Sequence, residues 1–158
     1  MKDASEGQEM VDIRLNRIVI KDGADHQWIY LTERSGHRGF PIIIGTNEAH
    51  EIQRVVTKDA PKRPLTHQLT HAVIDALGGR LARVDIVDLR ENTFYAQIVL
   101  RRNGDDIVID ARPSDALALG LRAGCPLRVA ESVLEQARSD AGGPDPLPDP
   151  EEPPEEPE

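Results

Sequence analysis

Two runs of strand-like sequence, each followed by helical sequence, constrain the fold of this chain more than any other feature. The first run contains three segments separated by turn clusters: 11–20, 27–33 and 40–45. The second run contains three more: 83–89, 93–102 and 107–111. Asn103-Gly104 is a strong signal for a two-residue hairpin. Short turns between consecutive strands predict two antiparallel meanders.

Helical patterns follow each run. Three are expected, at 46–58, 64–77 and 114–123, with Thr46 and Ser114 as N-caps, and a short strand at 127–129 and a helical segment at 131–137 complete the chain. The predicted order is β-β-β-α-α-β-β-β-α-β-α. Strand runs followed by helices favour an α+β fold, with two antiparallel β-meanders interleaved with helices in one compact domain, over a doubly wound parallel sheet.

The helix at 64–77 has the clearest apolar stripe in the chain. Residues at i, i+4, i+7 and i+8 spacing predict one buried face: Leu65, Leu69, Ala72, Val73, Ala76 and Leu77. At about 100° per residue, His67 lies almost opposite this stripe. We therefore expect His67 to lie off the core face.

Charge is distributed unevenly along the chain. From Ser139 onward the sequence has eight acidic residues and no basic one, together with seven of the twelve prolines. Removing these eight charges from the net charge of −9 leaves about −1 for residues 1–138. This composition predicts a disordered acidic Pro-rich tail at 138–158, after a disordered leader at 1–9 and a folded domain at 10–137. A nearly neutral domain offers weak support for broad nucleic-acid binding.

The sequence also predicts the compartment. The single cysteine, Cys125, excludes an intramolecular disulfide framework and fits a reducing environment. No apolar run reaches the roughly 18 residues of a membrane span, and the first nine residues have no apolar signal region. We expect a cytoplasmic protein without a membrane partner.

The motif Asp110-Ala111-Arg112-Pro113-Ser114-Asp115 falls where a strand ends and a helix begins. Backbone N–H groups at such a junction can hold an anion, and Arg112 is suited to clamping a phosphate. Asp110 and Asp115 could bind Mg²⁺ if the strand end turns back on the helix start. The alternative is local: Ser114 and Asp115 cap the helix, and Arg112 pairs nearby.

The motif Arg63-Pro64-Leu65-Thr66-His67 brings a cation, a hydroxyl and an imidazole to another helix start. His67 is either a general acid or base or a solvated surface residue. His67 and His71 have the i, i+4 spacing of a zinc pair, but Gln68 stands where a zinc protease has a glutamate, which argues against zinc. Glu48, at the margin of its helix's apolar stripe, is either structural or a metal ligand.

Four segments occur in a recognisable order: Phe40-Pro41-Ile42-Ile43-Ile44-Gly45 with Glu48-Ala49, Arg63 to His67, Asp88-Leu89 to Thr93-Phe94-Tyr95-Ala96, and Asp110 to Ala116. Together they closely resemble the bifunctional nuclease domain family, whose bacterial members long counted as a conserved domain of unknown function. The resemblance runs from about Val11 to Ala137. It implies a compact α/β domain, a homo-oligomer with a dimer favoured, and nuclease activity on DNA and RNA.

The resemblance also marks a set of positions as candidate site residues: Glu48, Arg63, His67, Asp110, Arg112, Ser114 and Asp115. Our leading hypothesis is a metal-assisted phosphodiesterase without an organic cofactor. Glu48, Asp110 and Asp115 would hold Mg²⁺ or Mn²⁺, and His67 would move a proton. Arg63, Arg112 and Ser114 would bind phosphate. The alternative is a non-catalytic homo-oligomeric binding or regulatory module with the same polar patch, which the nearly neutral domain favours.

Overall fold

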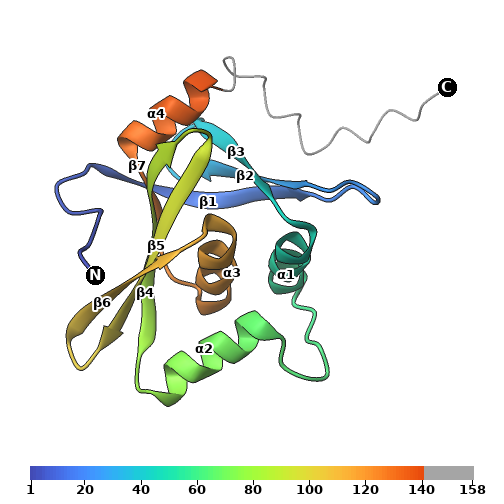
Figure 1. Cartoon of the computed structure of the whole chain (residues 1–158), viewed down its shortest axis with the longest axis vertical. Helices are drawn as coiled ribbons and strands as arrows, with labels where there is room; N and C mark the ends of the chain where they lie inside the picture. Colours follow the sequence, from blue (N-terminus) through green and yellow to red (C-terminus); the bar gives the residue numbers. More distant parts are fainter. Residues whose placement is uncertain (141–158) are drawn as a thin grey trace.

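The computed structural model describes residues 1–140 (Figure 1). Its elements are β1 (Met10–Val19), β2 (Gln27–Glu33), β3 (Gly39–Ile44), α1 (Thr46–Thr57), α2 (Thr66–Ala76), β4 (Arg80–Arg90), β5 (Thr93–Arg102), β6 (Asp105–Ala111), α3 (Pro113–Ala123), β7 (Leu127–Ala130) and α4 (Glu131–Asp140). The α+β class and the element order are confirmed. Asn103 and Gly104 adopt left-handed φ values of 51° and 82°, as the predicted hairpin requires.

The two meanders form one sheet because β7 lies between them. The strand order is β3-β2-β1-β7-β4-β5-β6. β7 pairs antiparallel with β1 and parallel with β4, so a strand of four residues joins two three-stranded units. This short strand fixes the relative position of the two candidate motifs, which follow different meanders.

The sheet is strongly curved. β1 has an irregularity between Leu15 and Arg17, and β4 has two more, and such bulges increase the local twist. The rings of Phe40 in β3 and Phe94 in β5 stack with centroids 5.6 Å apart, although four strands separate β3 from β5 in the sheet. The curvature creates a concave face that accommodates a helix.

α3 occupies the concave face. Its residues Ser114 and Ala116–Gly120 are buried, and a Cβ added at Gly120 would lie 2.6 Å from Val84 Cγ2. The absence of a side chain at Gly120 therefore lets the helix lie directly on β4. α1 and α2 both contact α3, so α3 connects the other two helices to the sheet (Figure 1).

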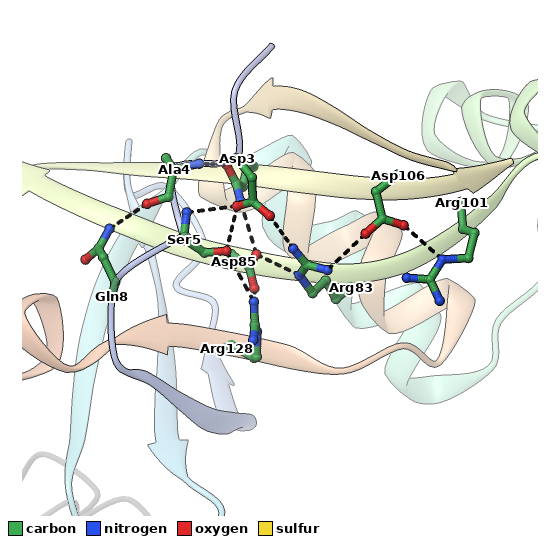
Figure 2. A network of polar contacts seen from close by, with 10 residues as sticks. Asp3, Ala4, Ser5, Gln8, Arg83, Asp85, Arg101, Asp106 and Arg128 are labelled. Atoms are coloured by element: carbon green, nitrogen blue, oxygen red, sulfur yellow. Dashed lines mark hydrogen bonds and ion pairs between the residues drawn. The ribbon is translucent and has the colours of Figure 1, made fainter. Parts of the chain in front are cut away.

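The opposite face of the sheet carries a buried polar network that holds the N-terminal segment (Figure 2). Asp85 is fully buried and accepts hydrogen bonds from Arg128 Nε at 2.7 Å and Arg83 Nε at 3.0 Å. Asp3 accepts hydrogen bonds from Arg83 and from Gln97 Nε2 at 2.7 Å. Residues 1–9 were expected to form a disordered leader, but these contacts place Asp3 to Gln8 against the sheet.

The final helix extends the folded part slightly beyond the expected boundary. α4 continues to Asp140, three residues past the domain end expected at 137, and buries Val133, Leu134 and Ala137. The rest of the predicted acidic tail lies outside the described residues. None of the helices within residues 1–140 has the length and apolar content that crossing a bilayer requires.

The predicted burial of α2 is wrong. The helix has no buried residue, and the side chains of its apolar ridge are exposed: Leu65 by 38%, Leu69 by 56%, Val73 by 48% and Leu77 by 63%. α3 and α1 already cover the concave face, so α2 contacts the domain chiefly through α3.

The two predicted N-caps are also wrong. The N-cap of α1 is Gly45, one residue before the predicted Thr46, and the N-cap of α3 is Arg112, two residues before the predicted Ser114.

The polar network gives the fold a specific dependence on pH. Burial alone would raise the pKa of Asp3, but hydrogen bonds from Ser5 and Gln97 and the charge of Arg83 outweigh it and lower the pKa to about 2. The resulting stability is present above the unfolded pKa and is lost as the pH falls through the folded pKa. Asp3→Asn should therefore lower the free energy of unfolding at neutral pH by roughly 1–2 kcal/mol.

Urea unfolding of the wild type and Asp3→Asn should show this difference close between about pH 4 and about pH 2. Asp25→Asn, in the exposed turn between β1 and β2, is the matched control and should show no such pH-dependent difference. A difference between Asp3→Asn and the wild type that persists undiminished at the lowest pH would contradict this account.

Candidate functional site

The first turns of three helices line one hollow of about 710 Å³. α1 and α2 both lie next to α3 (Figure 1). The lining residues from these first turns and their flanks are Thr46, Asn47, Glu48, Leu65, Thr66, His67, Arg112 and Asp115. Helix N-termini present unpaired backbone N–H groups and partial positive charge. The hollow also has His50, Glu51 and Arg54 in its lining, so it combines three positive helix ends with three carboxylates, two guanidiniums and two imidazoles.

Asp115 is the centre of this polar group. Its Oδ1 lies 2.8 Å from His67 Nε2, and its Oδ2 accepts a hydrogen bond from Arg112 Nε at 3.0 Å. The side chain of His67 is only 19% exposed. This contact joins α2 to α3 over a sequence separation of 48 residues. It also holds the imidazole ring in one orientation.

Arg112 links the remaining carboxylate to this pair. Its Nη2 donates to Glu48 Oε1 at 3.0 Å, so the guanidinium bridges α1 and α3. Hydrogen bonds to Glu48 first and to Asp115 second raise the pKa of Arg112 above its ordinary value, which keeps it charged. The side chain is 66% exposed, and within residues 1–140 its Nη1 has no hydrogen-bond partner. Arg112 therefore retains donors that point to no protein group.

The sequence-based prediction missed a buried carboxylate at the back of the hollow. Glu51 is 3% exposed and accepts hydrogen bonds from Arg122 Nη2 at 2.8 Å and Arg54 Nη1 at 3.1 Å. Its position one turn after Glu48 was a signal that both carboxylates share a side of α1. Its burial depends on Arg122, 71 residues away. Glu51 anchors α1 on α3 and thereby supports Glu48.

A second, mostly apolar hollow of about 780 Å³ adjoins the first, and Arg112 lines both. Its other lining residues come from β2, β3, the β4–β5 hairpin, the start of α3 and α4, and include Trp28, Ile43, Phe94, Pro113 and Ser114. The curvature that brings Phe40 and Phe94 together also forms this hollow. Arg112 therefore stands between a polar compartment and an apolar one.

The structure brings together four of the seven predicted site residues: Glu48, His67, Arg112 and Asp115. Ser114 is buried beside the apolar hollow, and Arg63 is exposed and lines neither hollow. Asp110 lies on the wrong side of the sheet. Asp110 in β6 pairs with Gln97 in β5, and Gln97 pairs with Asp85 in β4. The side chains of paired residues point to the same face of a sheet, so Asp110 shares the face of Asp85. That face carries the N-terminal segment, opposite α3.

The donor set does not fit the expected Mg²⁺ or Mn²⁺ site. Across residues 1–140, no group of three His, Cys, Asp or Glu side chains is placed to hold a metal ion. Glu48 and Asp115 both pair with Arg112, so a guanidinium lies between the carboxylates where a metal cation was expected. Asp110, the third expected ligand, lies elsewhere. We therefore derive no chemical step through a metal ion.

A substitution at Gly45 can separate the Arg112–Glu48 interaction from the His67–Asp115 interaction. A Cβ at Gly45 would lie 2.3 Å from Glu48 Oε2, whereas the φ of −71° suits any residue. Gly45→Ala should displace the Glu48 carboxylate and free Arg112 from it, with a change in unfolding free energy below about 1 kcal/mol.

A crystal structure of the Gly45→Ala variant should show Arg112 no longer bonded to Glu48, while His67 stays hydrogen-bonded to Asp115. A Glu48 side chain still bound to Arg112, or a disrupted His67–Asp115 hydrogen bond, would show that the two interactions are not arranged as described.

Comparisons with known proteins identify the family of the chain. The model of the bifunctional nuclease domain matches residues 29–141 of the chain. Uncharacterized proteins of Mycobacterium tuberculosis, from the strains H37Rv and CDC 1551 / Oshkosh, are each 43% identical over 128 residues, covering 81% of this chain and 76% of theirs. The matched region includes Glu48, His67, Arg112 and Asp115. The chain belongs to the bifunctional nuclease domain family.

Proposed function

We propose that the hollow between α1, α2 and α3 is the active site of a phosphodiesterase that hydrolyses DNA or RNA. One observation carries the proposal: three helix N-termini and Arg112 meet at a histidine that an aspartate orients. This arrangement provides the two functions that phosphodiester hydrolysis requires, stabilisation of phosphate charge and movement of a proton. The family membership supports the same activity.

Phosphate binding would use Arg112 together with the helix ends. The free Nη1 of Arg112 can donate to a non-bridging phosphate oxygen while Nε and Nη2 remain paired with Asp115 and Glu48. Residues at the starts of α1 and α2 line the same hollow, so the unpaired N–H groups of these first turns would add to the binding of the anion. Glu48 and Asp115 keep the guanidinium in place, and they also limit the site's net positive charge.

Proton transfer would use His67. When Nε2–H donates to Asp115 Oδ1, the other ring nitrogen, Nδ1, is left to accept a proton from the attacking water. Asp115 would then stabilise the imidazolium that forms. As the water oxygen bonds to phosphorus, the P–O bond to the leaving sugar oxygen would break, and that oxygen would take a proton from the imidazolium, which returns His67 to its neutral form. In this mechanism Asp115 is a positioning residue, and His67 and Arg112 are the catalytic residues.

The apolar hollow would take the nucleoside next to the bound phosphate. Arg112 lines both hollows, so a phosphate held there places its attached sugar and base toward Trp28 and Phe94. A base in a duplex cannot reach such a surface, whereas an unstacked base can stack on an aromatic ring. The proposal therefore favours single-stranded substrates.

The rival function is the non-catalytic module. Its supporting observation is that Arg112 already pairs with both Glu48 and Asp115, so each of these charged groups has a partner within the protein. In that case the residues hold three helices together, and their variants alter stability without altering any hydrolysis.

Hydrolysis of end-labelled single-stranded RNA and DNA separates these functions. His67→Ala should lower kcat by roughly 100-fold or more because the general base is lost. Asp115→Asn and Arg112→Ala should also lower the rate. Each reaction should be run with Mg²⁺, with Mn²⁺ and with a chelator, so that any metal requirement is measured directly.

His71→Ala is the matched control, since His71 lies one turn further along α2 and outside the hollow. It should retain the wild-type rate. All variants should be purified identically and checked for folding by circular dichroism. Equal rates in the wild type, His67→Ala and Asp115→Asn would point to a contaminating nuclease and refute the proposal.

The single tryptophan makes substrate binding visible without a label. Trp28 is the only tryptophan in the chain and lines the apolar hollow. A phosphorothioate single-stranded oligonucleotide should change its fluorescence on binding, and Phe94→Ala should weaken binding by roughly 10-fold through lost stacking. Binding that is detected by anisotropy while Trp28 emission stays constant would place the substrate elsewhere.

A further inference from the structure

The outward face of α2 is an apolar ridge without a partner in the described part of the chain, residues 1–140. Leu65, Leu69, Val73 and Leu77 are spaced four residues apart, with Leu65 and Leu77 at the two ends of the helix. All four are exposed, because the polar contact through His67 turns the opposite face of α2 toward α3. An apolar strip of this kind on a folded domain marks an interaction surface.

We propose that this ridge is the contact surface of a homodimer, in which α2 of one copy packs antiparallel against α2 of a second copy. A row of residues at four-residue spacing is the ridge that helices interdigitate in the most common class of helix packing. A second copy supplies an identical ridge. A two-fold axis near His71, the midpoint between Leu65 and Leu77, would place Leu69 of one copy beside Val73 of the other.

The low charge of α2 favours a second copy of the same helix as its partner. The helix contains no Lys, Arg or Glu, and its only acidic residue is Asp75. α1 and α4, by contrast, carry three and four Lys, Arg, Asp or Glu residues among their described positions. Two copies of α2 can therefore approach each other without like-charge repulsion. Nothing in the ridge offers the charge complementarity that a highly charged partner would require.

A dimer needs more contact area than α2 alone provides, and β6 offers further exposed apolar residues. An 11-residue helix is roughly 16 Å long, which gives less than the roughly 800 Å² per partner of a standard interface. Ile107 and Ile109 are also exposed. Ile109 is in register with Ile98, and Ile98 with Val84, which touches α3. These isoleucines therefore lie on the helix-bearing face, where a second copy seated on α2 would add contacts with them.

Other occupants fit the ridge less well. The 18 residues after Asp140 include seven prolines and seven acids but one large apolar residue, Leu147, too few to cover four apolar side chains. A helix that lies on a membrane surface carries Lys or Arg on its polar face, and α2 has neither.

The dimer would also shape the site. Leu65 belongs to the ridge and lines the same hollow as His67, so the second copy would form part of the hollow's rim. α2 has no fully buried residue and packs on the core through the partly buried Ile74, so the dimer contact would supply packing for its outward face. This proposal does not depend on nuclease activity, because its test measures association alone.

Light scattering coupled to size-exclusion chromatography of the full chain, over a wide range of concentration, tests the proposal. The wild type should be a dimer, and Leu69→Glu should weaken dimerisation by at least roughly 100-fold, because each interface would bury two unpaired carboxylates. Val56→Glu is the matched control, since Val56 is 54% exposed at the end of α1, off the ridge; it should remain a dimer. Leu69 and Val56 are both exposed in a single copy, so circular dichroism should show both variants folded.

A mixture of two variants tests the antiparallel arrangement. Leu69→Glu and Val73→Lys should each be monomeric alone, yet their mixture should form a heterodimer. In that heterodimer the new carboxylate faces the new ammonium, and the native Leu69 and Val73 face each other at the symmetric position. A monomeric wild type, an equal effect of Val56→Glu, or a mixture that stays monomeric would each overturn the proposal.

Discussion

The hydrogen bond between His67 and Asp115 determines how α2 meets the rest of the domain. α2 has no fully buried residue, and Ile74, partly buried against the core, is the apolar side chain that packs it within one chain, so apolar packing contributes little to its orientation. The 2.8 Å contact from His67 Nε2 to Asp115 Oδ1 turns the polar side of the helix toward α3. The apolar ridge must then face outward, since it lies on the other side of the same helix. One polar contact thus gives both an organised imidazole and an exposed apolar surface.

The site depends in turn on the position of α3. Bulges in β1 and β4 curve the sheet, and Gly120 lets α3 lie close against Val84. α1 is held on α3 by the buried Glu51–Arg122 ion pair. Because all three helices begin near one end of α3, their positive ends share one hollow, and Arg112 is placed between the carboxylates of Glu48 and Asp115.

The sequence predicted those features of the structure that depend on interactions between residues close together in the chain. The alternation of strands, the Asn103-Gly104 turn and the element order follow from backbone preferences, and they predicted the α+β fold. Helix geometry also placed His67 opposite the apolar stripe, but the expectation that His67 lies off the core face is wrong, because its side of α2 faces α3. Which face of α2 points inward could not be predicted, because a contact 48 residues away decides it. Asp110 was misplaced for a similar reason: strand register, rather than distance along the chain to Asp115, sets its face. The burial of Glu51 and the seating of residues 3–8 likewise depend on long-range ion pairs.

A double-mutant cycle on His67 and Asp115 tests this account most directly. Unfolding free energies of His67→Ala, Asp115→Ala and the double variant, measured by urea denaturation, give the coupling between the two side chains. The account predicts that the pair stabilises the domain by about 1 kcal/mol more than the two residues do separately. Strictly additive effects of the two substitutions would contradict it, since α2 would then not be oriented by this contact.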